Sequence, residues 1–246
     1  MGLYRKLLPA LDTHGVRGLF LRALGKLRLQ HLPQASFRES PEPHPFDRLH
    51  GTDTSGHIPG EQLGGNTPSD LYNTAYYGIS PSSLTHALQL LPEPPNGFTF
   101  VDLGCGKGRA LLVAAQFPFE RILGVELSAE LCRIARATAV PHPHIDIQQQ
   151  DATSVTYPGT PLLVYLYHPF LKPVLCRVLA NLERQRRNSR YPTYLLYASG
   201  HYAKVIARFP FLQQVLEYSI PLSAEDAAAD RHGISHERYT LYRASL

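Results

Sequence analysis

Acidic residues and closely spaced glycines follow one another at regular intervals in the middle of this chain. Asp102 ends an apolar run that begins at Phe98, and glycines follow at positions 104, 106 and 108. A turn without Cβ atoms can bend sharply and lets a ligand approach the backbone. The dinucleotide fingerprint needs a glycine at position 109, where the chain has Arg109. The pattern therefore predicts a nucleotide-cofactor turn and disfavours a nicotinamide or flavin site.

Two further acidic residues follow the glycine turn at the spacing that is typical of a nucleotide-binding site. The stretch 121–126 reads as a strand and ends in Glu126, about 20 residues beyond the turn, where a doubly wound sheet places a ribose-binding carboxylate. After another expected strand, over 144–149, comes Asp151. Each acid alone is typical of a solvated strand end. Their order and spacing together predict that both face the glycine turn across one shared cavity.

The run Pro161–Tyr167 reads as a fully buried parallel strand and leads into His168. In open α/β sheets ligands lie beyond the carboxyl ends of the central strands, so His168 should border the same cavity. An imidazole with a pKa of about 6.5 can hydrogen-bond a substrate or take a proton from it. A purely structural role at the strand end stays open.

The remaining elements must position these residues. Ser128 can cap a helix over 129–138, and Pro173 suits the first turn of an amphipathic helix after the His168 strand. A helix is expected over 84–91, one after the glycine turn over 110–117, and a short one around 201–208. Further strands are expected over 194–198, 211–220 and 237–243, the last two as an antiparallel pair separated by a polar loop from Ser223 to Ser235. The alternation of strands and helices predicts an α/β fold with a mostly parallel sheet.

The run hydrophobic-Asp-hydrophobic-Gly-x-Gly-x-Gly, followed by Glu126 and by Asp151-Ala152, resembles the cofactor motifs of class I S-adenosylmethionine (SAM) dependent methyltransferases. The resemblance implies a Rossmann-like, seven-stranded, mostly parallel sheet with one antiparallel strand and helices on both faces. It implies SAM as cofactor, with Lys107 and Arg109 facing outward or stabilising the helix start. The implied cofactor-binding residues are Asp102, Gly104, Cys105, Gly106, Gly108, Glu126, Leu127, Asp151 and Ala152.

The strand end His168-Pro169-Phe170 resembles the Asn/Asp-Pro-Pro-Tyr/Phe ending of methyltransferases that act on nitrogen, with His in place of Asn or Asp and one proline missing. It implies that these three residues contact the substrate, with His168 as the candidate catalytic residue. In this family the segment before the glycine turn often closes over the methionine end of SAM, which implies that Tyr76 and Tyr77 cover the cofactor or line the substrate entrance, with Tyr77 as the candidate substrate contact. Tyr76 and Tyr77 could equally pack the preceding segment onto the sheet. The Asp102–Arg109 turn and this strand end are also similar to bacterial methyltransferase-like proteins of undefined substrate, distantly similar to the non-SET histone lysine methyltransferases.

The implied function is methyl transfer to an unidentified acceptor, with the nitrogen of a protein or a small amine slightly preferred. Methylation of a small-molecule oxygen is the alternative among enzymes. A catalytically silent SAM-binding protein and an assembly or targeting subunit also fit the sequence.

The chain has 246 residues, enough for one α/β domain with an extension. Residues 1–38 contain seven Lys or Arg and one Asp, and their apolar spacing favours short amphipathic helices. We expect residues 1–65 to form this helical extension and a Pro/Gly-rich arm, and residues 66–246 to form the methyltransferase domain. The basic segment could pack on that domain, contact an acidic macromolecule or an anionic surface, or act as a targeting peptide.

The three cysteines are far apart and form no C-x-x-C pair, and the histidines of the arm are irregularly spaced. No metal site is therefore predicted. With no run long enough to span a membrane and no signal-peptide core, we expect a cytoplasmic protein.

Overall fold

The computed structural model describes residues 43–60, 63, 69, 72–187, 189–230 and 233–245. The basic segment of residues 1–38 and the helices predicted for it lie outside the described residues. Along the described chain the elements are α2 (Pro45–His50), β1 (His57–Ile58), β2 (Tyr76–Tyr77), α3 (Pro81–Gln89), β3 (Thr99–Leu103), α4 (Arg109–Ala114), β4 (Arg121–Glu126), α5 (Ala129–Ala139), β5 (Ile145–Gln149), the 3₁₀ turn η3 (Ala152–Ser154), β6 (Leu162–Tyr167), α6 (Lys172–Arg186), β7 (Thr193–Ala198), α7 (Ala203–Ile206), β8 (Leu212–Pro221), α8 (Ala224–Ala229) and β9 (His236–Ala244).

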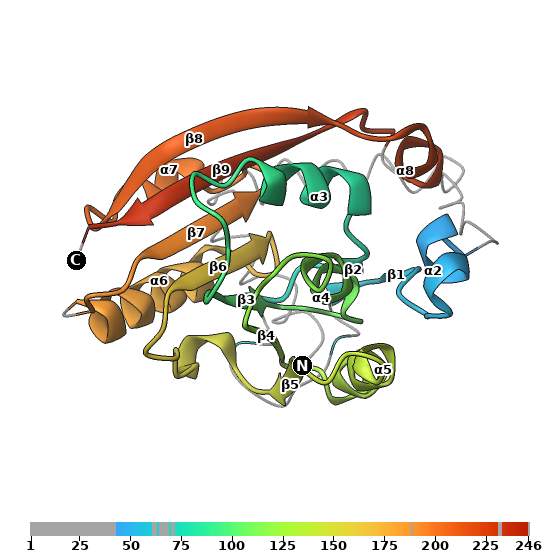
Figure 1. Ribbon diagram of the computed structural model, residues 1–246, viewed down its shortest axis with the longest axis horizontal. Coiled ribbons are helices and arrows are strands. Elements are labelled where there is room, and N and C mark those ends of the chain that lie inside the picture. The colour runs from blue at the N-terminus through green and yellow to red at the C-terminus, as the bar shows by residue number, and fades with distance from the viewer. Residues whose placement is uncertain are drawn as a thin grey trace, which may run out of the picture.

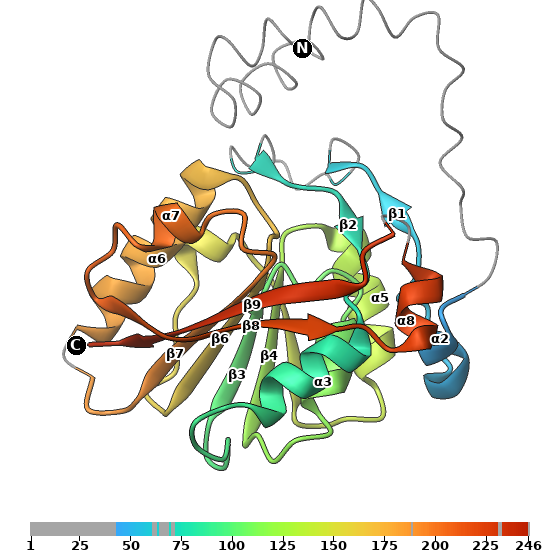
Figure 2. The same ribbon diagram turned by 90° about the horizontal axis from the view of Figure 1, so that it is seen from above.

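Seven strands form one sheet in the order β5-β4-β3-β6-β7-β9-β8 (Figure 1). The pairs from β5 to β7 are parallel, whereas β9 is antiparallel to both of its neighbours. The long strands β8 and β9 run side by side in Figure 2. The predicted mostly parallel sheet with one antiparallel strand is confirmed.

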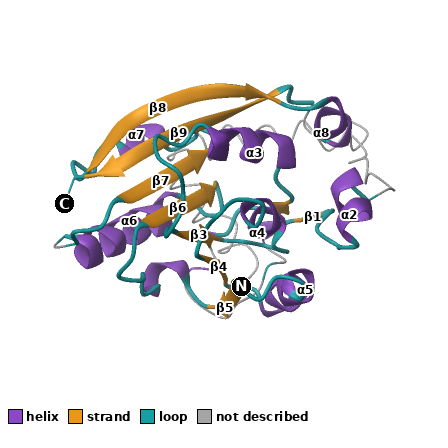
Figure 3. Cartoon of the chain, in the orientation of Figure 1, coloured by secondary structure: helices purple, strands orange, loops and turns teal. Residues whose placement is uncertain are grey.

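Helices cover both faces of the sheet (Figure 3). Strand β3 explains why both faces need cover, because all five of its residues are buried. Phe100 packs with α3, α4 and α5 on one face, while Val101 and Leu103 pack with α6 and α7 on the other. This is the alternation expected of a parallel strand between two helical layers.

The arm from residue 43 to residue 60 lies against this domain. His44 caps α2 by accepting from Phe46 N at 3.1 Å, and β1 pairs antiparallel with β2. The arm is therefore ordered where the structure describes it, while the domain boundary after residue 65 stays a prediction.

Three predicted boundaries are wrong. Helix α3 begins at Pro81 rather than at residue 84, because Ser80 is its N-cap residue and Pro81 suits the first turn. Helix α4 ends at Ala114 rather than Phe117, since Phe117 precedes Pro118 and closes a tight turn by donating to Ala114 O at 2.9 Å. The expected polar loop from Ser223 contains α8, which Ser223 caps by accepting from Asp226 N at 3.1 Å.

None of the helices in the described part of the chain is long and apolar enough to cross a membrane.

Candidate active site

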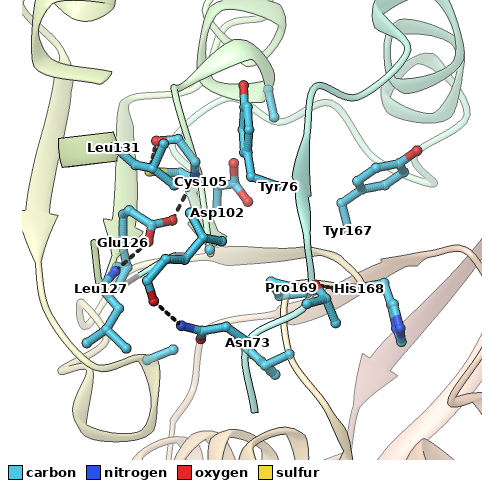
Figure 4. Close-up of a pocket in the computed structure, with 18 of the residues that line it drawn as sticks. Asn73, Tyr76, Asp102, Cys105, Glu126, Leu127, Leu131, Tyr167, His168 and Pro169 are labelled. Atoms are coloured by element: carbon cyan, nitrogen blue, oxygen red, sulfur yellow. Dashed lines mark hydrogen bonds between the residues drawn. The ribbon is translucent and has the colours of Figure 1, made fainter. Parts of the chain in front are cut away.

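A cavity of about 150 Å³ opens beyond the carboxyl ends of β3, β4 and β6. In the sheet β3 lies between β4 and β6, so the chain continues from β3 toward one side and returns later on the other side. Open α/β sheets bind ligands at such a point. Every candidate residue named from the sequence lines it except Gly108. Figure 4 shows Glu126, Cys105 and Asp102 toward one side of the cavity and Tyr167 and His168 toward the other.

Gly108 has a backbone role instead. It is the N-cap residue of α4, with φ +92°. A Cβ there would make only an ordinary contact, 3.5 Å from Ala135 Cβ on α5, so the left-handed backbone and not a lack of space favours glycine.

The backbone N–H groups of the glycine turn are already used within the protein. Gly104 and Cys105 both donate to Val125 O, at 2.8 and 3.1 Å. Gly106 donates to Glu126 Oε2 at 3.0 Å. A dinucleotide turn needs such amides to face a pyrophosphate, so this hydrogen bonding argues against that class of cofactor.

Two side chains lie directly on the glycine turn. A Cβ at Gly104 would stand 2.3 Å from Pro169 Cβ, and a Cβ at Gly106 would stand 2.3 Å from Tyr76 Cε2. Both glycines also have positive φ, +86° and +56°. The close approach that requires glycine at these two positions is made by the protein's own residues.

Glu126 fastens the end of β4 to the glycine turn. Besides the bond from Gly106, its Oε1 accepts from Leu127 N and Ser128 N, both at 2.8 Å. Burial raises the pKa of Glu126, and these backbone hydrogen bonds partly offset the rise. A carboxylate offers about four acceptor positions, so about one remains on Glu126, enough to accept from one ribose hydroxyl.

Asp102 is a buried carboxylate without a hydrogen-bond donor among the described residues. Its side chain lines the cavity and is 3% exposed. Burial and the negative charge of Glu126 raise the pKa of Asp102 well above its usual value. A ligand that places positive charge in the cavity would stabilise the ionised form of Asp102, since opposite charges attract strongly away from water.

Asp151 is held in place by its neighbours. Its Oδ1 accepts from Thr153 N and Oγ1, at 2.8 and 2.7 Å, and its Oδ2 accepts from Ser69 Oγ at 2.6 Å. Burial alone would raise the pKa of Asp151, but these hydrogen bonds and the charge of Arg177 hold it below the usual value. Oδ2 therefore stays ionised at neutral pH and can accept one further hydrogen bond, such as one from an amino group on a purine ring.

His168 directly follows β6 and has a left-handed conformation, with φ +47°. This conformation turns the chain so that Pro169 reaches Gly104, and Thr74 Oγ1 fixes it by donating to His168 O at 2.7 Å. The imidazole Nδ1 lies 3.3 Å from Tyr197 Oη, and the ring packs against His201. Burial and the neighbouring His201 lower the pKa of His168 to about 4, so the imidazole is neutral at pH 7.

The other substrate candidates gather beside His168. Phe170 pairs with Asn73 as an isolated antiparallel bridge, which brings the segment before β2 to the mouth of the cavity. Tyr77 packs edge-on against Tyr167, with ring centroids 5.5 Å apart. Tyr167 was missed from the sequence, although its place next to His168 at the end of a central strand is a usable signal.

The expectation that Lys107 and Arg109 face outward is wrong. Their exposed fractions are 8% and 5%. Lys107 Nζ donates to Ser55 O at 2.8 Å and pairs with Asp53. Arg109 donates to four groups of the arm and of the segment before α3: Thr54 Oγ1 at 2.7 Å, Ile79 O at 3.0 Å, Ser55 Oγ at 3.1 Å and Asp47 Oδ2 at 3.3 Å. Nothing local in the sequence points to partners 30 to 62 residues away.

Within the described ranges, no group of three or more His, Cys, Asp or Glu side chains is placed to hold a metal ion.

Comparisons with known proteins agree with the α/β fold described above. Residues 100–187 match the family model described as a methyltransferase domain. No curated protein matches the chain. Among solved structures, one similar chain comes from the complex between the Trm112 methyltransferase activator and the putative methyltransferase of Haloferax volcanii. It is 17% identical, the match covers 68% of this chain and 91% of that one, and the TM-score is 0.51.

TrmN from Thermus thermophilus is also similar. It is 17% identical with a TM-score of 0.50, and the match covers 68% of this chain and 49% of that one. At these identities the likeness shows the fold.

Proposed function

We propose that this chain, a SAM-dependent methyltransferase with the class I fold, transfers a methyl group to the nitrogen atom of an amine bound beside His168. The observation that carries the proposal is the buried Asp102, which faces the cavity without a hydrogen-bond donor among the described residues. SAM contributes the positive charges that such a carboxylate needs.

The lining residues fit the cofactor in our proposal. Asp102 would attract the positively charged methionine end, Glu126 would accept from one ribose hydroxyl, and Asp151 with Ala152 would hold the adenine ring. Gly104, Cys105, Gly106 and Leu127 would shape the wall against which the cofactor lies. When bound, SAM supplies a methyl group on a positively charged sulfur.

The work of the protein is mostly alignment, because a neutral amine needs only to be held with its lone pair toward the methyl group. The low pKa of His168 favours nitrogen over oxygen as the acceptor atom. An alcohol or phenol must lose its proton to react well, and an imidazole with a pKa of about 4 is a weak base. A neutral His168 can still orient an amine through a hydrogen bond. An oxygen acceptor remains the second candidate in this proposal.

The proposal includes a cytoplasmic location, in keeping with the free cysteines Cys105, Cys132 and Cys176. An acidic partner for residues 1–38 stays a prediction, since those residues lie outside the described chain.

Calorimetry with SAM and turnover of radiolabelled SAM test the proposal. The full chain should bind SAM and label amines or proteins in an acceptor panel, while the Asp102→Asn variant should bind SAM at least about tenfold more weakly. SAM binding without labelling of any acceptor would favour the silent binding protein. Labelling confined to phenols and alcohols would favour the oxygen-methylating enzyme.

A further inference from the structure

Glu237 is a buried carboxylate at the start of β9 that the cofactor does not account for. Its exposed fraction is 4%, and its Oε2 accepts from Ser83 Oγ at 3.1 Å. The hydroxyl of Tyr167 also favours the ionised form of this carboxylate and so lowers the pKa of Glu237. Among the described residues no Lys, Arg or His forms an ion pair with it. Burial raises the pKa of Glu237, so an ionised Glu237 is stabilised by hydroxyl groups alone.

Two tyrosines connect this carboxylate to the cavity. Tyr167 and Tyr77 both line the cavity, and their rings meet edge-on at 71°. The hydroxyl of Tyr167 also lowers the pKa of the Tyr77 hydroxyl, which burial raises. Glu237 can therefore act on the cavity through Tyr167 and Tyr77, on the side where Figure 4 shows Tyr167 and His168.

The charges around the cavity favour a cationic occupant. Asp102, Glu126 and Asp151 line it, and Arg109 is the one Lys or Arg among the described lining residues. The guanidinium of Arg109 is already paired with Asp47, which is 2% exposed. The proposed function assigns these three carboxylates to the cofactor, so an ammonium acceptor would be attracted by Glu237 and by the aromatic faces of the two tyrosines. An acceptor with a carboxylate or phosphate next to its reacting atom would find no unpaired Lys or Arg among the described lining residues.

We propose that Tyr77, Tyr167 and Glu237 form the acceptor subsite of this enzyme and that they bind a protonated amine. This inference rests on the proposed methyltransferase function and adds the charge class of the acceptor. Tyr77 and Tyr167 contact the ammonium group, and Glu237 is a positioning residue that acts through Tyr167.

The subsite also accounts for the proton that the amine must lose. The ammonium group gives one proton to Tyr167 Oη while Tyr167 gives its own proton to Glu237, which becomes a neutral carboxylic acid. The nitrogen then has a lone pair, and its bond to the methyl carbon forms as the carbon–sulfur bond breaks and leaves its electron pair on sulfur. No other reactant is needed.

A matched pair of probes tests the subsite. Benzylamine, which is protonated at neutral pH, and benzyl alcohol have nearly the same shape and differ in charge. With the full chain saturated with S-adenosylhomocysteine, calorimetry should show benzylamine binding at least about tenfold more tightly than benzyl alcohol.

Variants then test which residues cause the preference for benzylamine over benzyl alcohol. Glu237→Gln and Tyr167→Phe should each abolish the preference for benzylamine and leave the weak binding of benzyl alcohol unchanged, because a loss of shape alone would weaken both probes. Tyr194→Phe is the matched control, since Tyr194 donates to Glu93 Oε1 at 2.6 Å and neither residue lines the cavity. It should keep the wild-type preference.

Equal binding of the two probes by the wild-type chain, or an unchanged preference in a folded Glu237→Gln or Tyr167→Phe chain, would overturn the subsite. Absence of S-adenosylhomocysteine binding by the wild-type chain would overturn the proposed function and the subsite with it. Cofactor binding without a preference for benzylamine would overturn the subsite alone.

Discussion

The ring of Tyr76 lies on Gly106, so close that a Cβ on the glycine would stand 2.3 Å from Tyr76 Cε2. The hydroxyl of Tyr76 donates to Thr54 O at 2.6 Å. One side chain thus joins the arm to the glycine turn and covers the turn at the edge of the cavity.

Replacing Gly106 with alanine should displace Tyr76 and weaken SAM binding at least about tenfold. The new Cβ would clash with the ring, and the positive φ of +56° would add a strain of about 1 kcal/mol. Calorimetry and thermal unfolding measure the two effects. Gly97→Ala is the control, because Gly97 has φ +74° and nothing within 4 Å of its would-be Cβ. Wild-type SAM affinity in Gly106→Ala would contradict a role for this contact at the cofactor site.

The Asp102→Asn variant should lose most of its SAM affinity without losing stability. At neutral pH the buried negative charge costs folding free energy, because the folded-state pKa of Asp102 lies above the unfolded one. The amide removes that cost, so the free energy of unfolding without ligand should be unchanged or higher. Urea denaturation measures the free energy of unfolding, and calorimetry measures the affinity for SAM. A clear loss of stability with SAM affinity retained would assign Asp102 to the fold instead of the cofactor.

Removal of the guanidinium in Arg109→Met should destabilise the chain by about 3 to 5 kcal/mol, the usual cost of leaving one partner of a buried ion pair alone. Arg109 and Asp47 are both almost fully buried. Urea denaturation measures the change. Arg133→Ala supplies the control, since Arg133 pairs with Glu130 on the surface and its loss should change the stability little. Similar effects of the two substitutions would show that Arg109 does not hold the arm.

His168 should titrate with a pKa of about 4 in an NMR pH titration of the folded chain. Below pH 6.5 the unfolded chain gains a proton at this position that the folded chain gains only near pH 4. Stability should therefore fall as the pH drops from about 6.5 to about 4. The His168→Gln variant lacks this contribution, so the difference in unfolding free energy between it and the wild type should change over that window. A titration near 6.5 would mean that the imidazole is solvated and not packed against His201 and Tyr197.

The centre of the sheet was predictable because β3, β6 and β7 are nearly continuous apolar runs. The bounds expected for 121–126 agree with β4, and Ser128 caps α5 by accepting from Leu131 N. The gathering of Asp102, Glu126 and Asp151 around one cavity was predictable for a related reason. Each lies at or just beyond the carboxyl end of a parallel strand, and parallel neighbours place their carboxyl ends at one edge of the sheet.

Contacts made by distant segments were not predictable in this way. Glu237 reaches Tyr167 because β9 returns antiparallel beside β7, and a single acid at the start of a strand gives no sign of that neighbour. Asp47 and Arg109 are 62 positions apart, and their pairing follows from how the arm folds back on the domain. Periodicity indicates which face of an element is buried, but not which remote segment covers it.

Lys107 and Arg109 form ion pairs with Asp53 and Asp47 of the arm, and these contacts limit how far the chain can be shortened. A fragment trimmed to the stretch that matches the family model, residues 100–187, would retain the glycine turn, Glu126, Asp151 and His168. It would nevertheless uncover two buried cations, discard Tyr76 and remove the strand that carries Glu237. The smallest fragment that keeps these contacts therefore begins no later than α2 and extends through β9.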